Sequence, residues 1–309
     1  EDSINLENTV KKASQILKNN NIYSHELDAQ IILSDIMGIK REFLITNNEI
    51  KNVEKVVIND VNSDALDVAQ RSAKLNNILN FEISENETCR FFSLFSQKDN
   101  RGSVVDIDPF GSPTKYFDCS IRATMHGGLL SVTATDMQVL HGLAKNACKR
   151  KYYGVPIKTE YSNEIAIRLI LGCLYAVSGR LGIQIIPQFV QTHMHYYRIF
   201  VKVLTKKDQN QNLGYISHCF ECGNRIIEKK SSSCCDKCNE ELTSAGPLWI
   251  GQLFNKKFVI NMLNETPKFI VDKKCVGILE KSVLEAEMPA TYYTLDKIAS
   301  KIKGAPVKL

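Results

Sequence analysis

The chain has 309 residues, and its hydrophobic content of 44% is enough to bury a substantial core in two or more domains. Its formal net charge of +5 and pI of about 8.6 are mildly basic, which is compatible with a polyanionic partner but does not identify one. The longest apolar stretch, residues 165–177, is short and contains Arg168, and the first residues are not typical of a signal peptide. We therefore expect no membrane association and a cytoplasmic location, or a nuclear or mitochondrial one if the source is eukaryotic.

The amino-terminal segment is predicted to be helical. Between residues 8 and 50 the apolar residues recur at mixed helical spacing, at Leu17, Ile22, Leu27, Ile31, Leu33 and Ile36. Gly38 is the only glycine before Gly102, so no glycine-rich cofactor loop is expected in this part of the chain. Residues 1–50 are therefore predicted to form a helical head.

A strand that ends in an acidic residue follows this head. Residues 55–60 (KVVIND) are predicted to form the strand, and residues 62–77 are predicted to form a capped amphipathic helix. A carboxylate between a strand and a helix can accept hydrogen bonds from the ribose hydroxyls of a nucleotide cofactor. Asp60 is therefore a candidate cofactor contact.

The most informative motif is the run of residues 106–113 (DIDPFGSP), which follows the apolar pair Val104 and Val105. Proline stops the predicted strand, so Asp108 falls at the carboxyl end, where open α/β sheets bind their ligands. Asp108 is a candidate acceptor or base for an exocyclic amine, and Phe110 a candidate stacking surface for a purine. The alternative is an ordinary proline turn with a core phenylalanine.

Further elements along the chain extend this pattern. Residues 127–136 (GGLLSVTATD) are predicted to form the next strand, and the β-α-β alternation predicts a parallel doubly wound sheet. From about Tyr161 a helix is expected, followed by strands at residues 184–189 and 195–204 of a second, α+β domain. His193 and His195 near the last strand, and His218 further along the chain, are given no catalytic role.

A basic cluster leads into two tyrosines, Tyr152 and Tyr153. Interleaved cations and aromatic rings are able to contact RNA phosphates. The alternative is a solvated helix terminus with two core tyrosines. The candidate RNA-binding residues are Lys145, Lys149, Arg150 and Lys151.

The cysteines provide a metal-binding signal. Two C-x-x-C pairs, separated by twelve residues, have the spacing of a tetrahedral thiolate zinc site formed by Cys219, Cys222, Cys235 and Cys238. Cys234 could replace Cys235, and disulfides are the alternative to zinc. The other cysteines have no partner spacing and are expected to be buried or incidental thiols, namely Cys89, Cys119, Cys148, Cys173 and Cys275.

Taken together, five segments resemble the tRNA (guanine-26, N2)-dimethyltransferase family over about residues 51–300. In order they are VVINDVNSDA, VVDIDPFGSP, GGLLSVTATDMQVLHG, KRKYYGVPIKTEYSNEIAIRLILG and GPLWIGQLF. The resemblance implies an enzyme that uses S-adenosylmethionine to place one and then a second methyl group on a guanine amine of tRNA.

The same resemblance implies roles for individual residues. It makes Asp108 the catalytic carboxylate and Pro109 and Phe110 the rest of the base pocket. It makes Asp60 the ligand of the cofactor ribose and Glu87 a contact of the adenine amine, although the family usually has aspartate at the latter position. We also assign Asp106 of the central motif to cofactor binding.

The expected fold class is therefore α/β, with a class I (Rossmann-like) methyltransferase sheet that lacks its first strand and loop. The predicted domains are the helical head at 1–50, the methyltransferase domain at 51–155 and an α+β tRNA-binding domain at 156–309. The last contains a small zinc-binding insertion with its knuckles at 219–238. The expected partner is tRNA, and no obligate protein partner is evident.

Two alternatives follow from the first fifty residues. Residues 8–50 resemble the helical amino-terminal domain of release-factor glutamine methyltransferases, which would suggest protein glutamine methylation. That family uses an N-P-P-Y turn, however, whereas this chain has D-P-F-G. The second alternative is a non-catalytic tRNA-binding remnant that lacks the cofactor loop.

Overall fold

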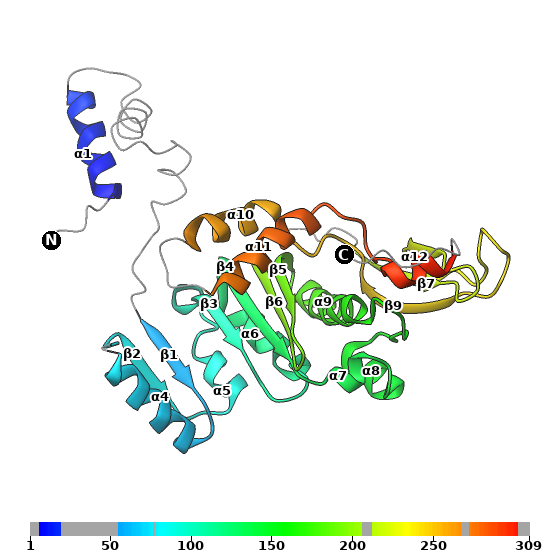
Figure 1. The fold of residues 1–309 in the computed structure, drawn as a ribbon. Helices are drawn as coiled ribbons and strands as arrows, with labels where there is room; N and C mark the ends of the chain where they lie inside the picture. The colour runs from blue at the N-terminus through cyan, green and yellow to red at the C-terminus, as the bar shows by residue number, and fades with distance from the viewer. Residues whose placement is uncertain (1–5, 20–54, 77, 206–211, 267–271, 302–309) are drawn as a thin grey trace. The chain divides into compact units, whose positions relative to one another are not determined.

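The computed structural model describes residues 6–19, 55–76, 78–205, 212–266 and 272–301 (Figure 1). It divides the chain into two compact units, Glu1–Glu85 and Asn86–Leu309. Each unit is described by itself.

The first unit contains a parallel β-α-β crossover. Strand β1 (Val56–Asn59) pairs with β2 (Phe81–Ser84) in parallel, with Val56 opposite Phe81, and helix α4 (Ser63–Leu75) connects them. The Asn62 side chain caps α4 by accepting a hydrogen bond from the Asp64 N–H at 3.0 Å. The predicted strand and helix are thus confirmed, and Asp60 lies between them as expected.

Helix α1 (Leu6–Asn19) is the described part of the expected helical head. The remainder of that head, and the position where a first strand and glycine loop would be expected, fall within residues 20–54. These residues lie outside the described part of the chain.

The main sheet of the second unit has the order β3-β4-β6-β5. Strand β3 (Gly102–Ile107) is parallel to β4 (Thr124–Ala134), while β6 (Tyr197–Thr205) is antiparallel to both β4 and β5 (Ile183–Thr192). The sequence predicted a parallel sheet for the methyltransferase segments, and β3 and β4 are parallel as expected. Strands β5 and β6, predicted to belong to a second domain, extend the same sheet as antiparallel strands, so the sheet is mixed. The β5–β6 pair is antiparallel because a short hairpin joins the two strands, and such a hairpin can connect only antiparallel strands.

This sheet contains strands from both sides of the predicted domain boundary at residue 155. Strand β6, expected in the second domain, pairs with the carboxyl-terminal half of β4, from Leu129 opposite Lys202 to Ala134 opposite Tyr197. The domain bounds stay a prediction, but the backbone hydrogen bonding of the sheet is continuous across residue 155.

Helix α9 (Ser162–Arg180) is buried on nearly every side and packs against β5, β6 and β9. Shorter helical elements surround the sheet: α5 (Thr88–Ser93), η1 (Lys98–Asn100), η2 (Thr114–Tyr116), α6 (Phe117–Ala123), α7 (Met137–Leu140) and α8 (Lys145–Tyr152). Among the described helices, none combines the length and apolar character that crossing a membrane requires.

A smaller antiparallel sheet has the order β8-β7-β9, formed by β7 (Leu213–His218), β8 (Arg225–Glu228) and β9 (Thr243–Trp249). Helices α10 (Lys256–Glu265) and α11 (Lys273–Glu285) pack on each other and on β5 around a core of Phe189, Val259 and Leu279. Helix α12 (Leu295–Lys301) follows them.

Two glycines test the packing of α9 and α11. A Cβ on Gly172 would lie 2.9 Å from the Cα of Leu248, whereas a Cβ on Gly277 would meet nothing within 4 Å. We expect Gly172→Ala to lower the free energy of unfolding by about 1–3 kcal/mol through overpacking against backbone. Gly277→Ala should raise it by about 0.5–1 kcal/mol through helix propensity. Urea unfolding of both variants measures the difference; equal stabilities would contradict the α9–β9 packing.

Candidate active site and metal centre

The D-P-F-G turn lies at the carboxyl end of β3. Ile107, the last residue of the strand, is buried and sits opposite Val132 of β4, and Asp108 follows it as an exposed residue. The Phe110 side chain is fully exposed, at 102%. The alternative of a core phenylalanine is therefore wrong, and the turn presents a carboxylate and an aromatic ring to solvent.

Two reciprocal hydrogen bonds fix this turn to the end of β4. The Gly111 N–H donates to Thr135 Oγ1 at 2.6 Å, and the Thr135 N–H donates to the Gly111 carbonyl at 3.0 Å. Gly111 has φ +80°, a left-handed conformation that glycine adopts without strain. The backbone on the carboxyl side of Phe110 is thus held in one position.

The next residue of the β4 end anchors helix α8. Asp136 accepts a hydrogen bond from the Tyr152 hydroxyl at 2.6 Å and forms an ion pair with Lys151 Nζ at 3.2 Å. Burial raises the pKa of the Tyr152 phenol, as does the neighbouring charge of Asp136, while a contact with the Ser112 side chain acts in the opposite direction. Helix α8 is therefore tied to the same end of the sheet as the D-P-F-G turn.

The candidate RNA-binding residues on α8 differ in their surroundings. Lys145, Lys149 and Arg150 are exposed, whereas Lys151 is engaged by buried Asp136. Tyr152 belongs to the core, and the next residue, Tyr153, is exposed at 65%. The alternative of two core tyrosines therefore holds for Tyr152 alone.

Two of the candidate cofactor residues hold hydrogen bonds at helix starts. Asp60 is exposed directly after β1, and its Oδ1 accepts from the Asn62 N–H at 2.9 Å. Glu87 caps α5 by accepting from the Arg90 N–H at 3.0 Å. Backbone N–H groups, foremost that of Arg90, hold the pKa of the Glu87 carboxyl below its ordinary value. Asp60 belongs to the first unit and Glu87 to the second.

The third candidate, Asp106, lies on β3 and pairs with Arg198 of β6, whose Nη2 is 2.6 Å from Asp106 Oδ2. Arg198 also donates to Thr133 Oγ1 at 3.1 Å and so reaches across β4. Arg198 is not among the site residues predicted from the sequence. The signal available was Arg198 as one of two cations, with Lys202, in the mostly apolar strand YRIFVKV.

A second polar cluster that was not predicted from the sequence lies near the carboxyl end of β4. Tyr197, at the start of β6, donates its hydroxyl to Asn163 Oδ1 at 2.9 Å, and His141 Nε2 lies 3.0 Å from the same oxygen. His141 also contacts the Tyr197 hydroxyl directly. These bonds hold the end of α7, the start of α9 and β6 together.

Two cysteines expected to be incidental thiols form a disulfide. Cys89 and Cys119 are bonded, with their Cα atoms 5.5 Å apart, and they join α5 to α6. The prediction failed because the pair is brought together by helix packing across 30 residues, which leaves no spacing pattern. Cys148 and Cys173 are buried as expected, and burial raises the pKa of each thiol to about 12.

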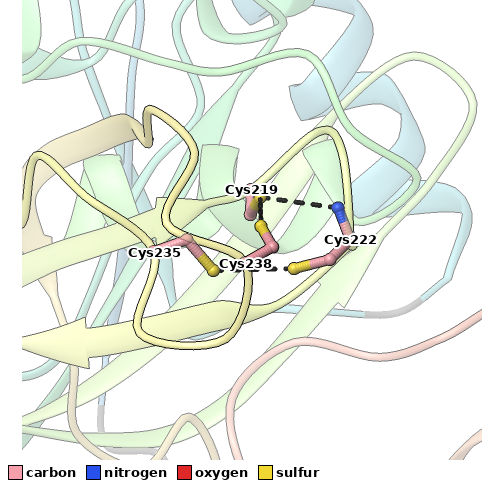
Figure 2. Close-up of side chains that lie close together, drawn as sticks. All are labelled: Cys219, Cys222, Cys235 and Cys238. Carbon is pink, nitrogen blue, oxygen red and sulfur yellow. Dashed lines mark hydrogen bonds between the residues drawn. The ribbon is translucent and has the colours of Figure 1, made fainter.

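The four C-x-x-C cysteines converge on one point (Figure 2). Their Sγ atoms all lie within 4.8 Å of one another, with 3.4 Å between Cys219 and Cys238 and 3.5 Å between Cys222 and Cys235. All four are free thiols, which argues against the disulfide alternative.

The two halves of the cluster have the same backbone geometry. Gly223 N–H donates to the Cys219 carbonyl at 2.8 Å and Asn239 N–H to the Cys235 carbonyl at 3.0 Å, with φ of +73° and +63°. Backbone N–H groups also point at sulfur, since the Cys222 N–H lies 3.5 Å from the Cys219 Sγ. Four converging sulfurs with N–H donors fit a tetrahedral Zn²⁺.

Cys234 lies outside this cluster. Its exposed thiol is 3.3 Å from both the carbonyl and the side-chain oxygen of Asn239, whereas the Cys235 thiol faces the other three. The geometry thus favours Cys235 over Cys234 as the fourth ligand.

Comparisons with known proteins agree with one another. The family model described as "N2,N2-dimethylguanosine tRNA methyltransferase" matches residues 16–309. The chain is 33% identical over 288 residues to a tRNA (guanine(26)-N(2))-dimethyltransferase of Methanobrevibacter smithii, which covers 89% of this chain and 72% of the relative. It is 32% identical over 262 residues to a tRNA (guanine(26)-N(2)/guanine(27)-N(2))-dimethyltransferase of Aquifex aeolicus, over 81% and 66% of the two chains.

The fold is also similar to a solved structure. Trm1 from Pyrococcus horikoshii, in a complex with S-adenosyl-L-methionine, matches with a TM-score of 0.67 and 26% identity over 81% of this chain and 70% of that one. The Rossmann-like methyltransferase sheet expected from the sequence is thereby supported. The family match also includes most of residues 8–50, so the alternative of a release-factor glutamine methyltransferase is not favoured.

Proposed function

Because the chain belongs to the N2,N2-dimethylguanosine tRNA methyltransferase family, we propose that it methylates the N2 amine of guanine 26 in tRNA. One methyl group and then a second are transferred from S-adenosyl-L-methionine. The observation that carries the proposal is the exposed Asp108 at the carboxyl end of β3, next to an exposed Phe110 and anchored through Gly111. An open α/β sheet binds its ligands at this place.

The Asp108 carboxylate makes the guanine amine reactive. The lone pair of this amine is delocalised into the purine ring, so the amine is a weak nucleophile. A carboxylate that accepts an N2 hydrogen restores electron density to nitrogen as the new N–C bond forms. The sulfonium group supplies an electrophilic methyl carbon, and its C–S bond breaks to leave a neutral thioether. The N2 proton passes to Asp108 and then to solvent.

Pro109 and Phe110 complete the base pocket in this proposal. Proline supplies no N–H, so it cannot compete with the guanine amine for the Asp108 oxygens. The exposed Phe110 ring offers a stacking face, and stacking on an aromatic ring contributes about 1–3 kcal/mol per base. The target guanine has to leave its helix to reach this turn.

Asp60, Glu87 and Asp106 are the proposed cofactor contacts. The support for Asp60 is its exposure directly after a parallel strand, which suits hydrogen bonds from ribose hydroxyls. Glu87 and Asp106 each keep an existing partner, Arg90 N–H and Arg198, so their contacts with the cofactor would be shared ones.

The α8 residues Lys145, Lys149 and Arg150 are proposed to bind tRNA phosphates. They are exposed on a helix that Asp136 ties to the catalytic end of the sheet. Lys151 contributes by holding Asp136 as well as by its charge. Such contacts give affinity that falls steeply with salt. Methylation of tRNA is compatible with the proposed cytoplasmic location, and no obligate protein partner is proposed.

The cysteine cluster is proposed to hold a structural Zn²⁺ through Cys219, Cys222, Cys235 and Cys238. All four positions of a tetrahedral site are filled by sulfur, which leaves no open position for a substrate. The ion would cross-link the two knuckles between β7 and β9.

The carboxylate role is tested by Asp108→Asn. We expect wild-type protein to bind S-adenosylmethionine in a calorimetric titration and to transfer labelled methyl groups to unmodified tRNA. The variant should retain cofactor and tRNA binding and lose about 100-fold or more of the transfer rate, the range for a positioned acid–base group. Asp118→Asn, an exposed aspartate paired with Arg122, is the matched control. Wild-type protein that binds tRNA without binding the cofactor would instead support the non-catalytic remnant.

Metal analysis tests the zinc site. Reduced, freshly purified protein should contain about one equivalent of zinc, because four thiolates bind the ion tightly at neutral pH. Cys235→Ser should lose the metal and unfold the knuckles, whereas Cys234→Ser, the adjacent matched control, should keep it. Equal zinc contents in the two variants would show that the ligand set is wrong.

A further inference from the structure

The β5–β6 hairpin brings an exposed group of aromatic and apolar side chains to the catalytic end of the sheet. The strands end with Thr192 opposite Tyr197, and the His193 N–H donates to the Tyr196 carbonyl at 2.9 Å to close a tight turn over Met194 and His195. Tyr197 also pairs with Ala134, the last residue of β4. The hairpin therefore lies at the end of the sheet where β3 and β4 have their carboxyl ends (Figure 1).

The hairpin offers a ready stacking surface. The His193 and Tyr196 rings are stacked, with centroids 4.9 Å apart and an interplanar angle of 19°. Met194 beside them is 77% exposed, and His193 and His195 are exposed as well. Tyr196 is half-buried. An exposed apolar side chain beside stacked rings is a feature that marks interaction sites.

A metal does not explain these histidines. Within the described part of the chain, the only group of three or more potential metal ligands is the cysteine cluster. The His193 and Tyr196 rings are nearly parallel, which suits a flat ligand, whereas the His195 ring is tilted by 56° to that of His193.

We propose that the His193–Tyr196 pair is a stacking platform for a nucleotide that neighbours the target guanine; this inference rests on the proposed function. Strand β4 alone separates β3 from β6, so the hairpin lies roughly 10 Å across the sheet from Asp108, a distance of one or two nucleotides. When a guanine leaves its helix, the adjacent base loses a stacking partner. A ring pair on the protein replaces that partner.

An RNA partner is favoured over a protein one by what surrounds the hairpin. The exposed Lys149 and Arg150 lie on α8, which Tyr152 joins to Asp136, two residues beyond the end of β4. Cations for phosphates, rings for bases and the catalytic carboxylate thus share one end of the sheet. Mixed basic and aromatic surfaces of this kind bind unpaired nucleic acid.

The experiment compares tRNA binding and methylation in His193→Ala/Tyr196→Ala and wild-type protein. We expect the variant to raise the KM and Kd for tRNA 5-fold or more, the effect of losing one stacked base, with kcat and the cofactor Kd within 2-fold of wild type. Tyr196→Phe should restore most of the affinity. His126→Ala, an exposed histidine at the start of β4 on the opposite end of the sheet, should bind as wild type does.

Salt dependence separates stacking from charge. The hairpin variant should weaken tRNA binding by the same factor at every salt concentration, whereas Lys149→Ala/Arg150→Ala should reduce the salt slope by about two. Lys273→Ala/Lys274→Ala at the start of α11 is the charge-matched control for the latter. An unchanged tRNA Kd in the hairpin variant would overturn the inference. Wild-type protein that binds tRNA but transfers no methyl group would contradict the proposed function and leave this binding comparison intact.

Discussion

The pair of hydrogen bonds between Gly111 and Thr135 is the constraint on which the candidate site depends. Parallel strands β3 and β4 end at the same edge, and these two bonds join the residues that follow them. Asp108 and Phe110 lie between the end of β3 and this anchor, so both can remain exposed while their backbone is held at both sides. An exposed loop without such an anchor would have to pay the ordering entropy when the guanine binds.

Two further polar contacts of the second unit lie at the same edge of the sheet. Asp136 follows Thr135 directly and fixes α8 through Tyr152, while Tyr197 fixes the end of α7 through His141. Each bond joins one element to a strand end, so the elements that carry cations and rings are positioned by the sheet. Disruption of one bond is therefore expected to affect the orientation of its own element more than the fold.

Much of this arrangement could be predicted from the sequence because it is encoded locally. A β-branched run stopped by Pro109 marks a buried strand end, and the C-x-x-C spacing marks two knuckles that the structure brings together around Cys219 and Cys235. The antiparallel pairing of β6 with β4, and the Cys89–Cys119 disulfide, could not be read in this way. Both depend on which surfaces meet after the chain has folded, and residues 30 or more apart leave no periodic signal for that.

The candidate site shows the same division between local and tertiary information. Asp108 and Phe110 were identified from their motif, whereas the engagement of Lys151 by Asp136 and of Asp106 by Arg198 emerged only from the structure. A charged residue in a motif looks available until its partner is known. The strand order determines that partner. Arg198 on β6 can reach Asp106 on β3 because a single strand, β4, separates them.

The anchoring of the turn is tested most directly by Thr135→Val, which keeps the shape of the side chain and removes the oxygen that accepts from Gly111 N–H. Single-turnover methylation of tRNA at saturating S-adenosylmethionine is the measurement, with Thr135→Ser as the control that retains the hydroxyl. We expect a transfer rate at least 10-fold below wild type for the valine variant, with an unchanged cofactor Kd and near-normal transfer by the serine variant. A wild-type rate of methyl transfer in the Thr135→Val variant would show that the position of Asp108 does not depend on this anchor.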